Sequence, residues 1–113
     1  MREKTYGAFT EWLSSVLMQG RENAVSREEL AMRSGLQDRA LRSRIELAKR
    51  DGLPIANAQD GKGYFIPATK EEVTAQIRQV KSRALALLSQ LRVLRNLLRE
   101  IEEREQYGDR SVV

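Results

Sequence analysis

The chain of 113 residues contains no cysteine and no histidine. Their absence excludes disulfide bonds, thiol nucleophiles, zinc sites built from Cys and His, and histidine acid–base chemistry. An enzyme would have to use carboxylates, lysines and hydroxyl groups, yet the sequence shows no glycine-rich phosphate loop and no carboxylates at metal-ligand spacing. We therefore expect no enzyme, no metal, no cofactor and no small-molecule ligand.

Long apolar runs are also missing, because no stretch approaches the roughly 18–20 residues that cross a membrane. The start of the chain leads into an amphipathic segment rather than a signal peptide, so we expect a cytoplasmic protein without a membrane partner. Hydrophobic residues make up 41% of the chain, enough for one small core plus an extension. The 20 Lys and Arg residues and the pI of about 9.8 favour a polyanionic partner.

The first helix is expected over residues 6–19. Phe9, Leu13 and Leu17 fall on one face at helical spacing, and Gly20 is a plausible end of the helix. Trp12 lies beside this apolar face, where packing is the leading interpretation and contact with DNA or a second subunit is the alternative.

The second helix carries a clear start signal. Ser26 and Glu29 have the spacing of a capping box, and Val25 and Leu30 have that of a hydrophobic staple. Gly35 supplies the residue of positive φ that ends such a helix. These signals concern structure and indicate no chemistry.

The third helix is expected over residues 38–50 and has two unlike faces. Leu41, Ile45 and Ala48 fall on the side that we expect in the core. The opposite face is mostly arginine and consists of Arg39, Arg42, Ser43, Glu46 and Arg50. Arginine can donate paired hydrogen bonds to guanine or to phosphate, so this face is a candidate DNA-binding surface. The alternative is an ordinary solvated face, and Glu46 is discordant because phosphates repel a carboxylate.

After Gly52 the pattern changes from helix to two short strands, around residues 53–57 and 64–66. Asp60-Gly61 and Lys62-Gly63 suit the loop of a β-hairpin between them. Lys62 would lie at the tip of this loop, where we expect its point charge to contact a phosphate. A solvated turn lysine is the alternative.

This order of helix, turn, helix and hairpin resembles the N-terminal winged helix-turn-helix domain of the biotin-operon repressor family of bifunctional biotin ligases. The resemblance covers residues 24–67 and rests on Gly35-Leu36, Leu41, Ile45, Gly52-Leu53-Pro54-Ile55 and Gly61-Lys62-Gly63-Tyr64. It implies that the third helix binds double-stranded DNA and that the hairpin, as a wing, supports it. It does not extend to the ligase domain, so no biotin chemistry is implied.

The residues expected at the DNA interface are Gln37, Asp38, Arg39, Arg42, Ser43, Glu46, Arg50 and Lys62. The family usually has Ser or Thr where Gln37 stands. Asp38 is therefore an alternative cap for the third helix, which would shift its start by one residue.

The C-terminal part is predicted to be one long helix, over residues 70–105. Thr69 and Glu72 form a second capping box before it. Apolar residues then recur in steps of four and three, namely Val73, Ile77, Val80, Ala84, Leu87, Leu91, Leu94, Leu98 and Ile101. This spacing is typical of a coiled coil.

A single helix cannot bury this apolar seam by itself. Each such side chain stabilises the protein by roughly 1.5–3 kcal/mol when it is buried. We expect residues 73–84 to pack on the preceding domain. The residues expected to pair with a second copy are Leu87, Leu91, Leu94, Leu98 and Ile101. Leu88 and Leu97 widen the seam, so a larger bundle is an alternative to a homodimer, and a helix folded back on its own domain is another.

The same helix contains a long stretch without acidic residues, between Glu72 and Glu100. Six basic residues lie within it, namely Arg78, Lys81, Arg83, Arg92, Arg95 and Arg99. A solvated face is the plain interpretation. An extra phosphate-binding surface and a binding site for an acidic partner are the alternatives.

Together these patterns predict a mainly α protein with a small β-hairpin wing, in which a winged helix-turn-helix precedes a long coiled-coil-like helix. The expected parts are a DNA-binding domain over 1–67, a dimerisation helix over 68–106 and a frayed tail over 107–113. The leading interpretation is a homodimer that binds specific double-stranded DNA and regulates transcription. The alternative is an accessory protein of phage or mobile-element replication or assembly that serves as an adaptor. The target sequence and the orientation of the paired helices stay open.

Overall fold

The computed structural model describes residues 6–58 and 63–111, with only the backbone described from residue 108 onward. The chain divides into an N-terminal unit, residues 1–76, and a C-terminal unit, residues 77–113. The boundary lies inside the last helix and later than the boundary expected after residue 67. No helix in the described residues is both long and apolar enough to cross a membrane.

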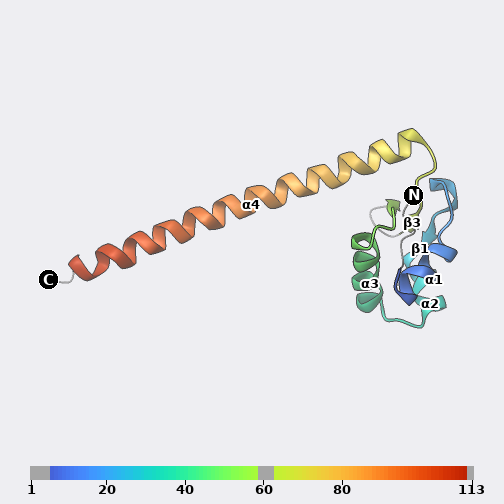
Figure 1. Cartoon of the computed structure of the whole chain (residues 1–113), viewed down its shortest axis with the longest axis horizontal. Helices are drawn as coiled ribbons and strands as arrows, with labels where there is room; N and C mark the ends of the chain where they lie inside the picture. The colour runs from blue at the N-terminus through green and yellow to red at the C-terminus, as the bar shows by residue number, and fades with distance from the viewer. Residues whose placement is uncertain (1–5, 59–62, 112–113) are drawn as a thin grey trace. The chain divides into compact units, whose positions relative to one another are not determined.

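The chain is mainly helical, with a small antiparallel sheet and a long last helix (Figure 1). The helices are α1 (Ala8–Val16), the 3-10 turn η1 (Arg21–Asn23), α2 (Arg27–Ser34), α3 (Asp38–Arg50) and α4 (Lys70–Ser111). The strands are β1 (Val25–Ser26), β2 (Ala56–Ala58) and β3 (Gly63–Phe65). The predicted coarse fold, mainly α with a small β part and a long C-terminal helix, is therefore confirmed.

Helix α1 ends at Val16, three residues before the expected end at Gln19. Leu17 already has an extended backbone, and the next residues form hydrogen bonds with the end of the sheet. The amide of Ile66 donates to the carbonyl of Met18, and the amide of Gly20 donates to the carbonyl of Ile66, both at 2.9 Å. This pairing takes the place of further helical hydrogen bonds, so Gly20 does not end the helix and instead precedes η1.

Helices α2 and α3 are joined by only three residues, 35–37. Ser26 caps α2 as predicted, because its Oγ accepts a hydrogen bond from the amide of Glu29 at 3.1 Å. Gly35 has the left-handed conformation, with φ of 73°, that ends α2 in the predicted way. The short connection fixes the start of α3 close to the end of α2.

The sheet has three strands in the order β1-β3-β2, and all its pairs are antiparallel. The expected hairpin corresponds to β2 and β3, with Ala56 opposite Phe65 and Ala58 opposite Gly63. Strand β1, which pairs Val25 with Tyr64, was not predicted. Two residues are too few to show a strand periodicity, and they also overlap the capping signal of α2.

The core of the N-terminal unit lies between its three helices and the sheet. Its fully buried centre consists of Leu13, Leu30, Leu41 and Ile45. Phe9, Trp12 and Val16 pack against this core from α1, so the packing interpretation of Trp12 is confirmed. Thr10 is also buried, and its hydroxyl donates a hydrogen bond of 3.2 Å to the Asp51 carboxylate just after α3.

The first turn of α4 is attached to the N-terminal unit through Glu72. The Thr69 hydroxyl accepts a hydrogen bond from the amide of Glu72 at 3.1 Å, which confirms the predicted cap. The carboxylate of Glu72 accepts from the amides of Ala68 at 2.8 Å and Arg21 at 2.9 Å. These two amides, that of Ala68 with the larger effect and that of Arg21 with the smaller, lower the pKa of Glu72 from its ordinary value of 4.5, because they stabilise the charged form.

We expect Glu72→Gln to loosen this attachment, because a glutamine side chain offers one acceptor oxygen where the carboxylate offers two. Amide hydrogen exchange near neutral pH should show less protection at Arg21 or Ala68. A carboxylate whose pKa is lower in the folded than in the unfolded state stabilises the fold at pH values above its unfolded-state pKa. This contribution is lost as the pH falls through its folded-state pKa. The stability difference between the natural protein and the variant should therefore shrink below about pH 4.5.

The matched control is Glu71→Gln, because Glu71 lies in the same turn and its side chain makes no hydrogen bond or ion pair within the described residues. It should leave both amides protected. Equal protection in the two variants would contradict the role given to Glu72.

The expected packing of residues 73–84 on the preceding domain is wrong for Val73, which is 43% exposed. Polar residues lie against the N-terminal unit instead. Gln76, one turn after Glu72, accepts a hydrogen bond from the amide of Asn57 at 3.4 Å. Glu72 and Gln76 therefore make the polar contacts between the start of α4 and the rest of the N-terminal unit, while Val73 stays exposed.

Helix α4 also extends beyond the expected end at residue 106 and continues to Ser111, where a frayed tail was predicted. Gly108 is its only glycine and costs about 1 kcal/mol relative to alanine, which a long helix can absorb. Within the C-terminal unit every described side chain, from residue 77 to residue 107, is exposed.

Candidate nucleic-acid interface

Helix α3 has the two faces that its sequence predicts. Leu41 and Ala48 are completely buried and Ile45 is 2% exposed, so the apolar side lies in the core. The opposite side, called here the α3 outer face, consists of Arg39, Arg42, Ser43, Glu46 and Arg50, all of which are exposed. One helix therefore brings these five predicted residues together on one surface.

Three members of the α3 outer face have no partner among the residues that the structure describes. Arg39, Ser43 and Arg50 form no side-chain hydrogen bond or ion pair with any residue that the structure describes. An exposed guanidinium without a partner keeps all five N–H donors for an external acceptor. Such donors on a rigid helix suit a phosphate or the edge of a base.

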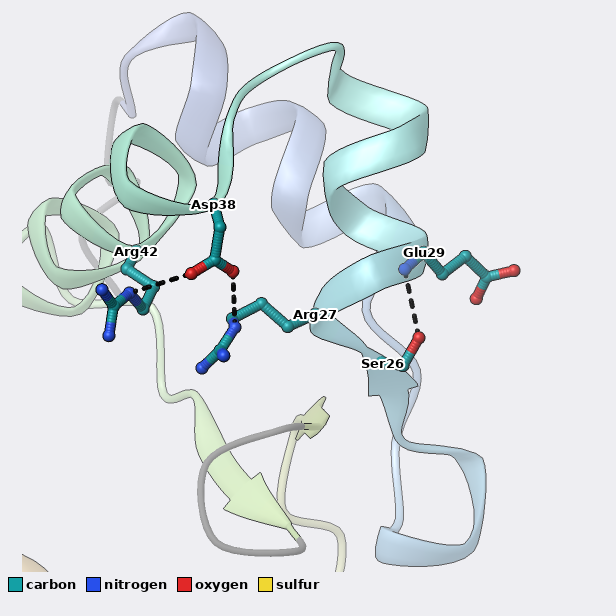
Figure 2. A network of polar contacts seen from close by, with 5 residues as sticks. All are labelled: Ser26, Arg27, Glu29, Asp38 and Arg42. Carbon is teal, nitrogen blue, oxygen red and sulfur yellow. Dashed lines mark hydrogen bonds and ion pairs between the residues drawn. The ribbon is translucent and has the colours of Figure 1, made fainter.

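Asp38 joins the starts of α2 and α3 (Figure 2). One of its carboxylate oxygens lies 2.6 Å from Nε of Arg27, the first residue of α2. The other lies 3.3 Å from Nε of Arg42, one turn along α3. Asp38 is the first residue of α3 and Gln37 is its N-cap, so the alternative that Asp38 caps the helix is wrong.

The ion pair with Asp38 leaves the far end of Arg42 available. The contact uses Nε, and in Figure 2 the two terminal nitrogens point away from Asp38. Holding the guanidinium at one end restricts its rotamers without using its terminal donors, so less entropy is lost when it binds a ligand. Both side chains are more than half exposed, so the pair itself adds little to stability.

The discordant carboxylate of Glu46 has a local partner. Its oxygen lies 3.3 Å from Nζ of Lys49, one turn further along α3. The pair is neutral as a unit, which reduces the repulsion that Glu46 would exert on a nearby phosphate. The α3 outer face therefore has a net positive character despite Glu46.

The remaining predicted contact residues are Gln37 and Lys62, and the structure describes only the first of them. Gln37 is exposed at the N-terminus of α3, and its side chain makes no capping hydrogen bond. Its amide group forms no hydrogen bond with a residue that the structure describes, so it can meet a ligand beside Asp38. Lys62 lies outside the described residues.

Sequence reasoning missed Arg27 and Leu47. Arg27 is linked to the site by its ion pair with Asp38, which is eleven residues away in the chain. Leu47 is 53% exposed on α3, one turn after Ser43, and a leucine there can contact the methyl group of thymine. Leu47 does not fall on the helical face formed by Leu41, Ile45 and Ala48, and this spacing could have indicated that it is exposed. No pattern in the sequence indicated the contact of Arg27.

Arg44 does not belong to the α3 outer face, although it lies on the same helix. Its guanidinium lies over the ring of Phe9 in α1, 5.8 Å from the ring centre. This cation–π contact connects α3 with α1. Arg44 therefore serves as a natural control for arginines that face outward.

The C-terminal unit carries a second candidate interface along α4. The residues predicted to pair with a second copy are 38–61% exposed, and they are Leu87, Leu91, Leu94, Leu98 and Ile101. Exposed leucines at regular heptad spacing form a continuous apolar stripe, which is costly to leave in water. We call this stripe, residues 87–101, the α4 seam.

Comparisons with protein-family models, with curated proteins and with solved structures find no match for this chain. The two candidate interfaces therefore stand on the geometry and charge of the chain itself.

Proposed function

We propose that the N-terminal unit is a winged helix-turn-helix and that the α3 outer face binds the major groove of double-stranded DNA. The observation that supports this proposal most strongly is the set of exposed arginines on the outer face of α3. Within the described part of the chain Arg39 and Arg50 have no partner, while Asp38 contacts Nε of Arg42 and leaves its terminal nitrogens pointing away. A rigid helix with an arginine-rich outer side has the shape and the donors that the major groove accepts.

The neighbouring elements support this proposal. Helices α2 and α3 are joined by a three-residue turn that contains glycine, as in helix-turn-helix units. The β2–β3 hairpin follows α3 and corresponds to the wing. In this proposal the start of α2, with Arg27, lies near the DNA backbone because Asp38 ties it to α3.

We further propose that the protein is a homodimer through the α4 seam. A dimer would bury the exposed leucines of the seam and present two α3 outer faces to one DNA molecule. Two-fold proteins of this kind bind half-sites spaced by about 34–36 Å or by multiples of that distance. The proposed role is a cytoplasmic transcription regulator.

Selection of bound sequences from a pool of random DNA duplexes tests this function. We expect a palindromic consensus, bound roughly 10³-fold or more tightly than bulk DNA. A single half-site would contradict the dimer but not DNA binding. Binding without sequence preference would contradict the regulator and favour the adaptor role, and absence of binding would contradict the interface itself.

A further inference from the structure

Opposite charges occupy different parts of α4 in the C-terminal unit. A basic segment starts at its N-terminal end with Arg78, Lys81 and Arg83 and contains no acidic residue before Glu100. An acidic end follows and consists of Glu100, Glu102, Glu103, Arg104 and Glu105, with a net charge of −3 from four glutamates and one arginine. All these side chains are exposed, so none has its charge buried within the chain.

This layout distinguishes the two ways of pairing two α4 helices. In a parallel pair, each acidic end lies beside the other acidic end and the basic segments lie beside each other. In an antiparallel pair, each acidic end lies beside the basic start of the other helix. Charges along a helix pair contribute mainly to orientation and specificity, because exposed ion pairs add little affinity each.

We propose that α4 pairs with α4 of a second copy in antiparallel orientation, so that the acidic end of each chain binds the basic start of the other. This inference rests on the homodimer proposed above and adds its orientation. It gives the basic start of the acid-free stretch a specific partner, namely the acidic end of the same protein.

The heptad positions define the register of this pair. In an antiparallel coiled coil, each core layer pairs the first seam position of a heptad in one helix with the second seam position of a heptad in the other. This places Leu91 opposite Leu94 of the partner subunit. Leu87 then lies opposite Leu98 of the partner subunit, and Ala84 lies opposite Ile101 of the partner subunit. The small side chain of Ala84 is thereby matched with a large one.

The same register defines the charged neighbours that flank the core. Lys81 lies beside Glu102 of the partner subunit, which is an attractive pair that the two-fold axis repeats. Arg83 lies near Arg104 of the partner subunit, which is the one repulsive contact among these flanking pairs. Arg104 is therefore the residue at which the two orientations predict opposite effects.

The first experiment measures the dimer dissociation constant of full-length Arg104→Glu and Arg104→Gln by sedimentation at low salt. In the antiparallel pair, glutamate at position 104 replaces repulsion of Arg83 by attraction. The dimer should become roughly three- to tenfold tighter, with glutamine in between, and the gain should fade at high salt. In a parallel pair, Arg104 lies within two acidic ends, so the same change would weaken the dimer and overturn the proposal.

The second experiment uses the natural absence of cysteine. Ser82→Cys and Ser89→Cys each give one site for a spin label, and both serines lie on the side of α4 opposite the seam. At about 1.5 Å per residue, the antiparallel register separates the two labels along the helix axis by about 32 Å at position 82 and about 10 Å at position 89. A parallel pair gives the same distance at both positions.

The outcomes separate the orientation from the dimer itself. A longer distance at position 82 than at position 89, together with tighter dimers of Arg104→Glu, supports the antiparallel pair. Equal distances in a protein that sediments as a dimer overturn the orientation and leave the homodimer standing. A monomer at tens of micromolar overturns both.

Discussion

Replacing Leu91 and Leu94 with aspartate is expected to convert the dimer into folded monomers. The two positions form the centre of the α4 seam, and the double substitution removes four leucines from the proposed interface. At roughly 1.5–3 kcal/mol per leucine, the loss is at least about 6 kcal/mol, or roughly a 10⁴-fold weaker dimer. Burial of the introduced carboxylates would cost more, so the helices should separate instead. Sedimentation at tens of micromolar measures the change.

The matched control is Ser89→Asp together with Asn96→Asp, which adds the same charge to the same helix on the side opposite the seam. This control should remain a dimer. A natural protein that is monomeric at the same concentration would refute the homodimer. Loss of the dimer in the control as well would show that charge on α4, and not the seam, governs association.

The same monomers should bind DNA much more weakly although their N-terminal unit stays folded. Its core extends no further along the chain than Ile66, so substitutions in the C-terminal unit leave the core unchanged. In a dimer the second α3 binds within an already formed complex, and this effect can contribute a factor of roughly 10²–10⁴. Monomers should therefore lose affinity for a palindromic site and keep their affinity for a single half-site.

The elements that the sequence predicted correctly are those with local signals. The cap at Ser26, the left-handed Gly35 and the cap at Thr69 involve contacts within four residues, and all are confirmed. The two faces of α3 follow from helical periodicity alone. The end of α1 was wrong because its determinant, the pairing of residues 18–20 with Ile66, lies almost fifty residues away.

The candidate site shows the same division. Periodicity sufficed to place Arg39, Ser43 and Arg50 on one exposed surface, because a helix fixes the direction of each side chain. Two contacts join separate elements, namely that of Asp38 with Arg27 and that of Glu72 with Arg21. They depend on how these elements pack in three dimensions, which the spacing of residues in the sequence does not show. Strand β1 escaped prediction for the same reason, because Val25 is a strand residue only through Tyr64.

Substitution of Arg39 and Arg42 by alanine is expected to abolish most specific DNA binding while the protein stays folded. Both side chains are exposed, and neither contributes to the core. Asp38 contacts Nε of Arg42, so the terminal donors of Arg42 are oriented before binding. We therefore expect Arg42, more than Arg39, to form hydrogen bonds with a DNA base. Arg42→Ala alone should cost about 1–3 kcal/mol on the preferred site and much less on random DNA.

No residue that the structure describes orients Arg39, so we expect it to act as a charge near phosphate. Arg39→Ala should weaken binding to every sequence about equally and reduce the salt dependence by about one unit. Arg33→Ala with Arg44→Ala removes the same charge from side chains that Glu29 and Phe9 already engage, and serves as the control. Titration of specific and random duplexes at several salt concentrations separates these effects. If the Arg39 and Arg42 double variant bound both duplexes as tightly as the control variant, the α3 outer face could not be the DNA interface.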